Sequence, residues 1–230
     1  MRERDTVWST LSYVLFFAML TSLYLIFLFA PIERTMGHVQ RIFYFHVPSA
    51  WVAFLAFFMV FLASVAYIMT RNLRYDRLAL ASAEVGVIFC TIVLVTGPIW
   101  ARPAWGIWWT WDARLTSTLV LWLIYASYLL LRGFVEEERR KALLAAVVGI
   151  VGFVDVPIVY MSIRWWRTQH PQPVFAGGEG SGLDPQMRLA FFFTLAVFTI
   201  LFAILTRLSA GVRRAEQDLA ELDRLIAIKE

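Results

Sequence analysis

Long apolar stretches separated by short polar segments dominate the chain. Six of them are long enough to form transmembrane helices: residues 10–30, 48–69, 79–99, 115–132, 142–162 and 187–207. A bilayer core about 30 Å thick needs roughly 20 apolar residues per helix. The pattern therefore predicts an all-α polytopic membrane protein with six transmembrane helices. The fourth stretch is short, so we expect its helix to begin within the preceding loop.

The polar segments on the two sides of these helices differ in positive charge. The side that includes both termini carries 14 of the 21 Lys and Arg residues, and the other side carries seven. Cytoplasmic segments of membrane proteins are enriched in Lys and Arg. We therefore expect both termini in the cytoplasm and the loop at about 100–116 on the opposite, outer side of the membrane.

The C-terminal segment has a different pattern. We divide the chain into a six-helix membrane domain, residues 1–207, and a cytoplasmic amphipathic helix, residues 208–230. Apolar residues recur in this tail at alternating steps of three and four: Val212, Ala215, Leu219, Leu222 and Ile226. Such a stripe is typical of a helix that rests on the bilayer surface or on the protein's own loops. A docking helix for a cytoplasmic partner is the other interpretation.

Composition supports the membrane assignment and excludes several classes of protein. The chain is 60% hydrophobic with a mean hydropathy of +0.67, whereas soluble domains are about 45–50% apolar. Cys90 is the single cysteine, so an intramolecular disulfide and a covalent C-x-x-C-H haem attachment are excluded. There is no cluster of Lys and Arg of the kind that nucleic-acid binding requires.

Tryptophan is concentrated in one segment, WARPAWGIWWTWDARL, at residues 100–115. Five of the ten tryptophans lie within twelve residues there. An interfacial belt accounts for one or two tryptophans per helix end, but not for five in one loop. If the segment is helical, one face carries Trp105, Trp108, Trp109 and Asp112, and Trp111 points elsewhere. Pro103 and Gly106 leave the start of such a helix open.

A flat aromatic shelf that ends in a carboxylate suits a large planar ligand with polar edges. A porphyrin has such a shape, because its ring is apolar and stacks on indole, while its propionates pair with arginine. A quinone, a lipid or a simple interfacial belt remains an alternative at this point. Residue types alone therefore favour haem without excluding the other ligands.

All three histidines lie on the predicted outer side. His46 lies just before the second apolar stretch and His170 follows the fifth, so the two can approach the tryptophan segment from different directions. Each can offer one neutral ring nitrogen to iron while the other nitrogen is held by a neighbouring acceptor. We predict His46 and His170 as the metal ligands. His38 is not expected to be a ligand, because it would compete with His46 for one face of the haem.

Several outer arginines are candidates for the propionates. Arg114, beside the tryptophan segment, is the strongest, and Arg41, five residues before His46, follows. A second aromatic pair, with its flanking arginines, is a weaker candidate for the same site: Trp165, Trp166, Arg164 and Arg167. Arginine at an outer helix end also commonly binds lipid phosphate, which is the alternative for each of them.

Two acidic residues, Glu84 and Asp155, lie within predicted helices. A carboxylate inside a membrane is costly unless it is paired or faces a polar interior. Glu84 is near the inner end of its helix and can reach the interface. For Asp155 an interhelical hydrogen bond and a proton relay are the two interpretations.

Three segments together resemble a known family. WGIWWTWDARLT resembles the "WWD" motif of the haem-handling membrane proteins of cytochrome c assembly. RIFYFHVPSAW and VPIVYMSIRWWRTQHPQP look like the two histidine segments of one branch of these proteins, the CcmC family, except that Gln169 stands where leucine is expected. The likeness covers nearly the whole chain.

The resemblance implies a site and a pathway. Haem b would be held at the periplasmic face on a platform that the motif assigns to Trp105, Trp108, Trp109, Trp111, Asp112 and Arg114. His46 and His170 would be its axial ligands. The haem would then pass to the periplasmic haem chaperone CcmE. The transporter subunits CcmA and CcmB and the small membrane protein CcmD would be partners.

We therefore expect a haem-delivery protein and not an enzyme, because no nucleophile or acid–base constellation stands out. One alternative is a membrane cytochrome b that transfers electrons, although such proteins usually bury both histidines between their helices. The other is a transporter or scaffold subunit whose tryptophans only anchor it in the interface.

Overall fold

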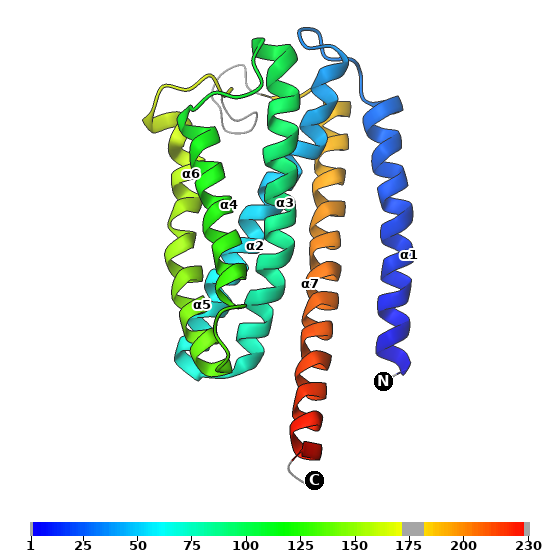
Figure 1. Ribbon diagram of the computed structural model, residues 1–230. Coiled ribbons are helices and arrows are strands. Elements are labelled where there is room, and N and C mark those ends of the chain that lie inside the picture. Colours follow the sequence, from blue (N-terminus) through cyan, green and yellow to red (C-terminus); the bar gives the residue numbers. More distant parts are fainter. Residues whose placement is uncertain (1, 172–181, 228–230) are drawn as a thin grey trace.

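The computed structural model describes residues 2–171 and 182–227 (Figure 1). These residues are overwhelmingly helical, and no strand forms among them, which confirms the all-α prediction. The helices are α1 (Arg2–Tyr24) with a π-helical turn (Leu25–Phe29), a 3-10 helix (His38–Ile42) leading into α2 (Phe43–Thr70), α3 (Leu73–Trp105), α4 (Ala113–Leu131), α5 (Glu138–Phe153), α6 (Asp155–Trp165) and α7 (Pro185–Ala227).

Six helical segments within the described ranges are long and apolar enough to cross a membrane, as the sequence predicts. The third is longer than expected, because α3 continues to Trp105 instead of ending near residue 99. The fifth is divided into α5 and α6 at Val154. Pro157 explains the break, because proline has no N–H to donate to the carbonyl of Phe153.

Asp155 lies at this break and is buried. Its Oδ2 atom has no hydrogen-bond partner among the described residues. An interhelical hydrogen bond through this oxygen is therefore absent there, and the proton relay stays a prediction. Glu84, the other membrane carboxylate, bonds Ser209 and Arg213 and so ties α3 to α7.

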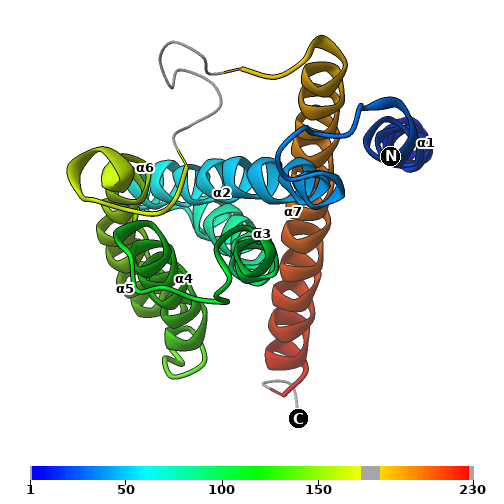
Figure 2. The same cartoon turned by 90° about the horizontal axis from the view of Figure 1, so that it is seen from above.

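Seen from above, α2 and α3 lie at the centre of the molecule (Figure 2). Helices α4, α5 and α6 cover one side of this pair, α7 covers the other, and α1 packs chiefly against α7. The rings of Phe57 and Tyr125 stack in the core with centroids 3.8 Å apart. A Cβ atom added at Gly86 would lie 2.8 Å from the Phe57 ring, so glycine permits the close approach of α3 to α2.

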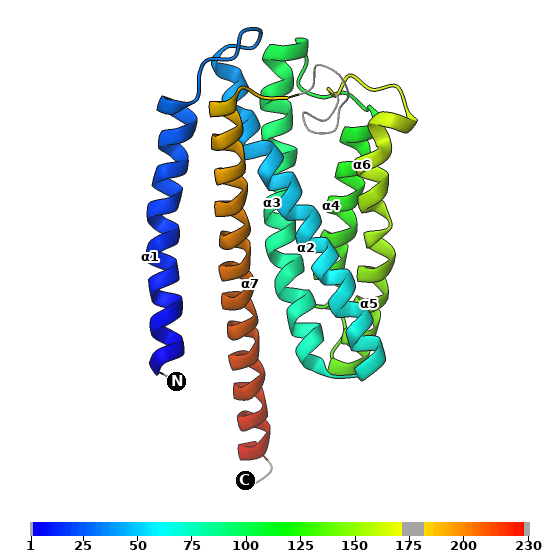
Figure 3. The same cartoon turned by 180° about the vertical axis from the view of Figure 1, so that it is seen from behind.

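Both chain ends lie at one end of the bundle, opposite the loop between α3 and α4 (Figures 1 and 3). This agrees with an even number of crossings. α7 is one unbroken helix across the predicted boundary at residue 207, so the tail continues the sixth span directly. The two-part division of the chain stays a prediction.

Helix α2 is strongly tilted. It packs along α3, and farther along its length on α5, but not along α6. In Figure 3 α2 crosses in front of α3, and it diverges from α6 at the end that carries the α3–α4 loop. This divergence leaves space for a ligand at that end.

A buried ion pair fixes α3 to α4 at the opposite end. Arg132 donates two hydrogen bonds to Asp76, of 2.7 and 2.6 Å, and both side chains are at least nine-tenths buried. We expect Asp76→Ala to lower the free energy of unfolding by about 3–5 kcal/mol, because it leaves the Arg132 charge buried and unpaired. Denaturation of the purified protein by SDS would measure this loss.

The matched control for this prediction is Lys141→Ala. Lys141 pairs with Glu138 on the surface of α5, at 2.8 Å, and such pairs contribute about 0.2–1 kcal/mol. Equal losses in the two variants would contradict the role given to burial.

Candidate functional site

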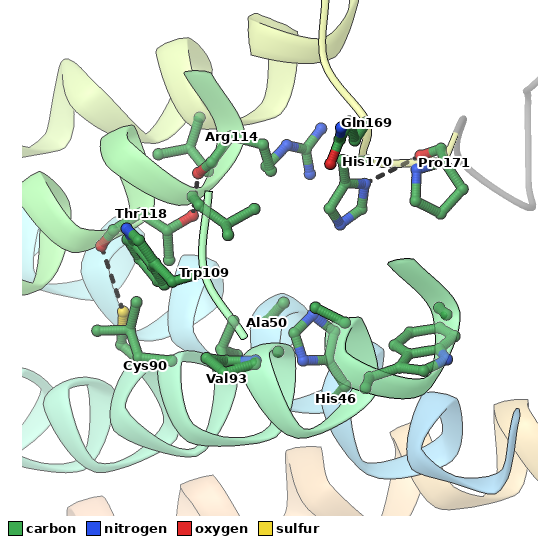
Figure 4. Close-up of a pocket in the computed structure, with 18 of the residues that line it drawn as sticks. His46, Ala50, Cys90, Val93, Trp109, Arg114, Thr118, Gln169, His170 and Pro171 are labelled. Atoms are coloured by element: carbon green, nitrogen blue, oxygen red, sulfur yellow. Dashed lines mark hydrogen bonds between the residues drawn. The ribbon is translucent and has the colours of Figure 1, made fainter. Parts of the chain in front are cut away.

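A pocket lies where α2, α3 and α4 meet the segment that follows α6 (Figure 4). Its volume is about 160 Å³, and most of its lining is apolar. The polar and aromatic side chains that line it are His46, Phe54, Trp100, Trp105, Trp109, Arg114, Thr118, Gln169 and His170. The pocket therefore combines parts of the two histidine segments and of the tryptophan segment.

His46 lies in the first turns of α2 and is buried. Its Nδ1 atom is 2.9 Å from Oγ1 of Thr96, and that hydroxyl donates its own proton to the carbonyl of Ile92 at 2.6 Å. Because the Thr96 hydroxyl proton is already used, Nδ1 of His46 must be protonated and donate the hydrogen bond to Thr96 Oγ1. The Nε2 lone pair is left for another partner. The Trp100 ring packs edge-on against the imidazole, with centroids 5.8 Å apart.

His170 lies outside the helices and is partly buried. Its Nδ1 atom is 3.0 Å from the carbonyl oxygen of Pro171, which can only accept, so Nδ1 donates here too. Burial lowers the pKa of His170, and the nearby Arg114 charge lowers it further. The ring is thus neutral at physiological pH. Figure 4 shows His46 and His170 on opposite sides of the open space.

Asp112 is not among the lining residues of the pocket in the described structure. Its Oδ1 atom accepts the Leu115 N–H at 3.0 Å, which makes it the N-cap of α4. Its Oδ2 atom accepts the Thr168 hydroxyl at 2.9 Å, and Thr168 Oγ1 in turn accepts the His170 N–H at 3.0 Å. Asp112 therefore connects the start of α4 to the backbone of a predicted ligand. The cap could have been recognised from an aspartate just before an apolar helix, but Thr168 carried no such signal.

The helical arrangement considered for Trp105 to Asp112 is wrong. α3 ends at Trp105, and Gly106 has a φ of 80°, a left-handed conformation that glycine adopts without strain. The chain from there to Asp112 is not helical. Consequently the four predicted side chains do not share a helix face.

The tryptophans divide into two groups. Trp105 and Trp109 line the pocket together with Trp100, which was not among the predicted site residues. The indole N–H of Trp109 is buried and has no partner among the described residues. Trp108 and Trp111 are 58% and 75% exposed, and Trp111 packs edge-on against Trp109 with centroids 5.6 Å apart.

Arg114 is held at the edge of the pocket. Its Nε donates to Oγ of Ser162 at 3.1 Å, and its Nη2 donates to the carbonyl of Tyr160 at 3.0 Å. Its Nη1 has no hydrogen-bond partner in the described part of the chain, and Figure 4 shows the guanidinium near His170. The side chain is thus positioned to bind an anion beside the histidines.

The other candidate residues lie elsewhere, and so does His38, which was not expected to be a ligand. Arg41 stands over the Phe27 ring, 5.6 Å from its centroid. Trp165 and Trp166 form an exposed edge-to-face pair at the end of α6. His38 begins the 3-10 helix before α2. None of these side chains is among the lining residues of the pocket in the described structure.

These features define a class, a multi-pass membrane protein with a tryptophan-walled pocket at one end and two imidazoles across it. The family described as "Heme exporter protein C", CcmC, matches residues 1–222, and the chain belongs to this family. The resemblance found in the sequence is thereby confirmed.

Curated relatives agree with this membership. Heme exporter protein C of Bradyrhizobium diazoefficiens is 37% identical over 177 residues, which cover 76% of this chain and 67% of the relative. The Escherichia coli K12 protein of that name is 35% identical over 185 residues, 77% of this chain and 71% of its own. A putative ccmC-like mitochondrial protein of cytochrome c biosynthesis from Marchantia polymorpha is 33% identical, with coverages of 80% and 77%.

Membership in the CcmC family establishes the general role of the chain. The chain is a membrane component of haem handling in cytochrome c maturation.

Proposed function

We propose that the chain holds haem b in this pocket at the periplasmic face of the inner membrane, and that His46 and His170 are its axial ligands. One observation carries the proposal. Both imidazoles have Nδ1 engaged as a donor and Nε2 left with its lone pair, and both line the same pocket. Metal-bound histidines typically show this pattern, because the bond at the second nitrogen fixes the tautomer and the ring orientation.

The remaining side chains fit the rest of the haem. The apolar walls and the rings of Trp100, Trp105 and Trp109 suit the flat macrocycle. Arg114 can bind a propionate through Nη1, a charge-assisted hydrogen bond. The unpartnered indole N–H of Trp109 is a second donor for a propionate oxygen.

The exposed part of the tryptophan segment suits a partner. Trp108 and Trp111 lie outside the pocket, and exposed aromatic residues are common anchors of protein interfaces. We assign them to docking of the periplasmic chaperone CcmE, which would receive the haem. CcmA, CcmB and CcmD are the other expected partners. The excess of positive charge on the side of the termini supports a periplasmic position of the pocket.

The electron-transfer alternative is less well supported. His170 lies outside the spans and His46 in the first turns of α2, so a haem between them would sit at the end of the bundle. A delivery protein needs such an exposed position, whereas an electron-transfer cytochrome does not.

The two groups of tryptophans give a test of this function. We expect Trp105→Ala/Trp109→Ala to reduce bound haem at least about tenfold, because stacking and burial are lost from the wall of the pocket. Trp108→Ala/Trp111→Ala is expected to keep its haem but to deliver less of it. Haem absorbance of the purified variants and covalent haem on co-expressed CcmE are the two measurements.

The parent protein is the control for both. A parent protein from haem-replete cells without a Soret band would refute the proposal. Loss of haem in Trp108→Ala/Trp111→Ala, with none in the other variant, would reverse the roles of the two groups.

A further inference from the structure

A second, larger cavity of about 490 Å³ adjoins the pocket. It is a groove between α2 and α6, and we call it the α2–α6 groove. The lining residues common to the pocket and the groove are His46, Ala50, Phe54, Trp100, Arg114, His170 and Pro171. The groove is therefore continuous with the proposed haem site and ends at the two histidines.

The tilt of α2 creates this groove. α2 leaves α6 at the loop end of the bundle and meets α5 at the other (Figure 3). The lining on α2 extends from Phe43 to Phe58, roughly 22 Å of helix at 1.5 Å per residue. At the far end Phe58 packs against Phe153, with ring centroids 5.6 Å apart, which closes the groove there.

The long side of the groove is open to the surroundings of the bundle. Trp51 and Phe58 on α2 are 54% and 40% exposed, and Tyr160 on α6 is 38% exposed. All three line the groove and lie within segments that can span the membrane. The surroundings at this depth are lipid, so the groove opens sideways into the bilayer.

Charge is confined to one end of the groove. Its described lining is otherwise apolar or aromatic: Val47, Phe54, Leu55, Phe58, Val156 and Ile163 are examples. The cationic side chain is Arg114, which lies beside His170 at the end shared with the pocket. A ligand with a flat apolar body and one anionic edge fits this distribution, with its acidic edge at Arg114 and its body along the groove.

We propose that the α2–α6 groove is a lateral entrance through which haem reaches the pocket from the outer leaflet of the membrane. The proposal rests on the proposed haem site. A haem that is dissolved in lipid enters between α2 and α6, its propionates reach Arg114, and the ring then turns into the space between the histidines. The macrocycle does not have to cross water on this route.

The test fills the groove without touching the pocket. Leu55→Trp/Tyr160→Trp adds bulk from both walls at residues that line the groove alone, and the Tyr160 carbonyl that holds Arg114 is retained. Leu62→Trp/Val147→Trp is the matched control, because these lipid-facing residues of α2 and α5 lie outside the groove. Each protein is reconstituted in phosphatidylcholine vesicles and mixed with vesicles that contain haem b.

We expect the groove-filling variant to acquire its Soret band about tenfold more slowly than the parent. The added bulk would raise the activation free energy of haem entry by the amount that a tenfold change in rate implies. Its final spectrum in detergent micelles should equal that of the parent, and the control variant should load at the parental rate. Equal loading rates for all three proteins would overturn the lateral entrance. A parent without a Soret band under any condition would instead refute the haem site itself.

If the double variant does not fold, Leu55→Trp alone replaces it and is compared with Leu62→Trp. A slower loading rate in Leu55→Trp supports the entrance, and an unchanged rate overturns it.

Discussion

Replacing either His46 or His170 with alanine is expected to convert six-coordinate haem to a five-coordinate form and to weaken haem binding by about 100-fold or more. The reason is geometric. Both residues line the pocket, and the Nδ1 bond to Thr96 or to the Pro171 carbonyl fixes each ring while leaving the Nε2 lone pair for iron. Loss even of a residue that orients a metal ligand costs about 10–100-fold in metal affinity, so loss of the ligand itself should cost at least as much.

The measurement is the absorption spectrum of the purified variants, together with a haem titration. His38→Ala is the matched control, because it removes an imidazole from the same side of the protein but outside the pocket. Glycine variants at the two ligand positions should regain the six-coordinate spectrum when free imidazole is added. Parental spectra in both alanine variants, or an equal effect of His38→Ala, would exclude axial ligation by this pair.

Thr168→Val is expected to reduce haem affinity by about 10–100-fold, although Thr168 does not line the pocket. Valine keeps the shape of threonine but removes the hydroxyl that joins Asp112 to the His170 N–H. The segment that carries His170 would then lose its attachment to α4. The iron would keep both potential ligands, but one of them would no longer be held in place.

Thr168→Ser is the control, because serine keeps the hydroxyl. Asp112→Ala should show the same loss of haem affinity and, in addition, a loss of about 1 kcal/mol of stability, because it also removes the helix cap. In the double variant Asp112→Ala/Thr168→Val the two losses of haem affinity should not add, because both substitutions break the same link from Asp112 through Thr168 to His170. Haem titration and thermal unfolding measure the two quantities. Parental affinity in Thr168→Val, or full additivity in the double variant, would contradict the connection.

The two experiments separate direct and indirect contributions to one site. The histidine variants remove atoms that would touch iron, whereas the Thr168 and Asp112 variants alter only the position of His170. A mixed result is informative, since normal binding in Thr168→Val with loss in His170→Ala would mean that Pro171 alone orients the imidazole.

The sequence alone determined the class of the protein and most candidates for its site. Hydropathy is a local property, and a segment of about 20 apolar residues has few stable alternatives to a membrane helix. The six spans therefore followed from the pattern without any tertiary information. The concentration of tryptophan between Trp100 and Trp111, and the positions of His46 and His170 at the ends of apolar stretches, could also be read from the local sequence.

Only the tertiary structure decided which of these side chains meet. Gly106 ends α3 in a left-handed conformation, so Trp109 turns into the pocket while Trp111 is exposed. The attachment of Asp112 to Thr168 joins segments 56 residues apart, and the groove depends on the angle at which α2 crosses the bundle. Such features depend on the path of the backbone and on the packing of whole helices, which no short stretch of sequence specifies.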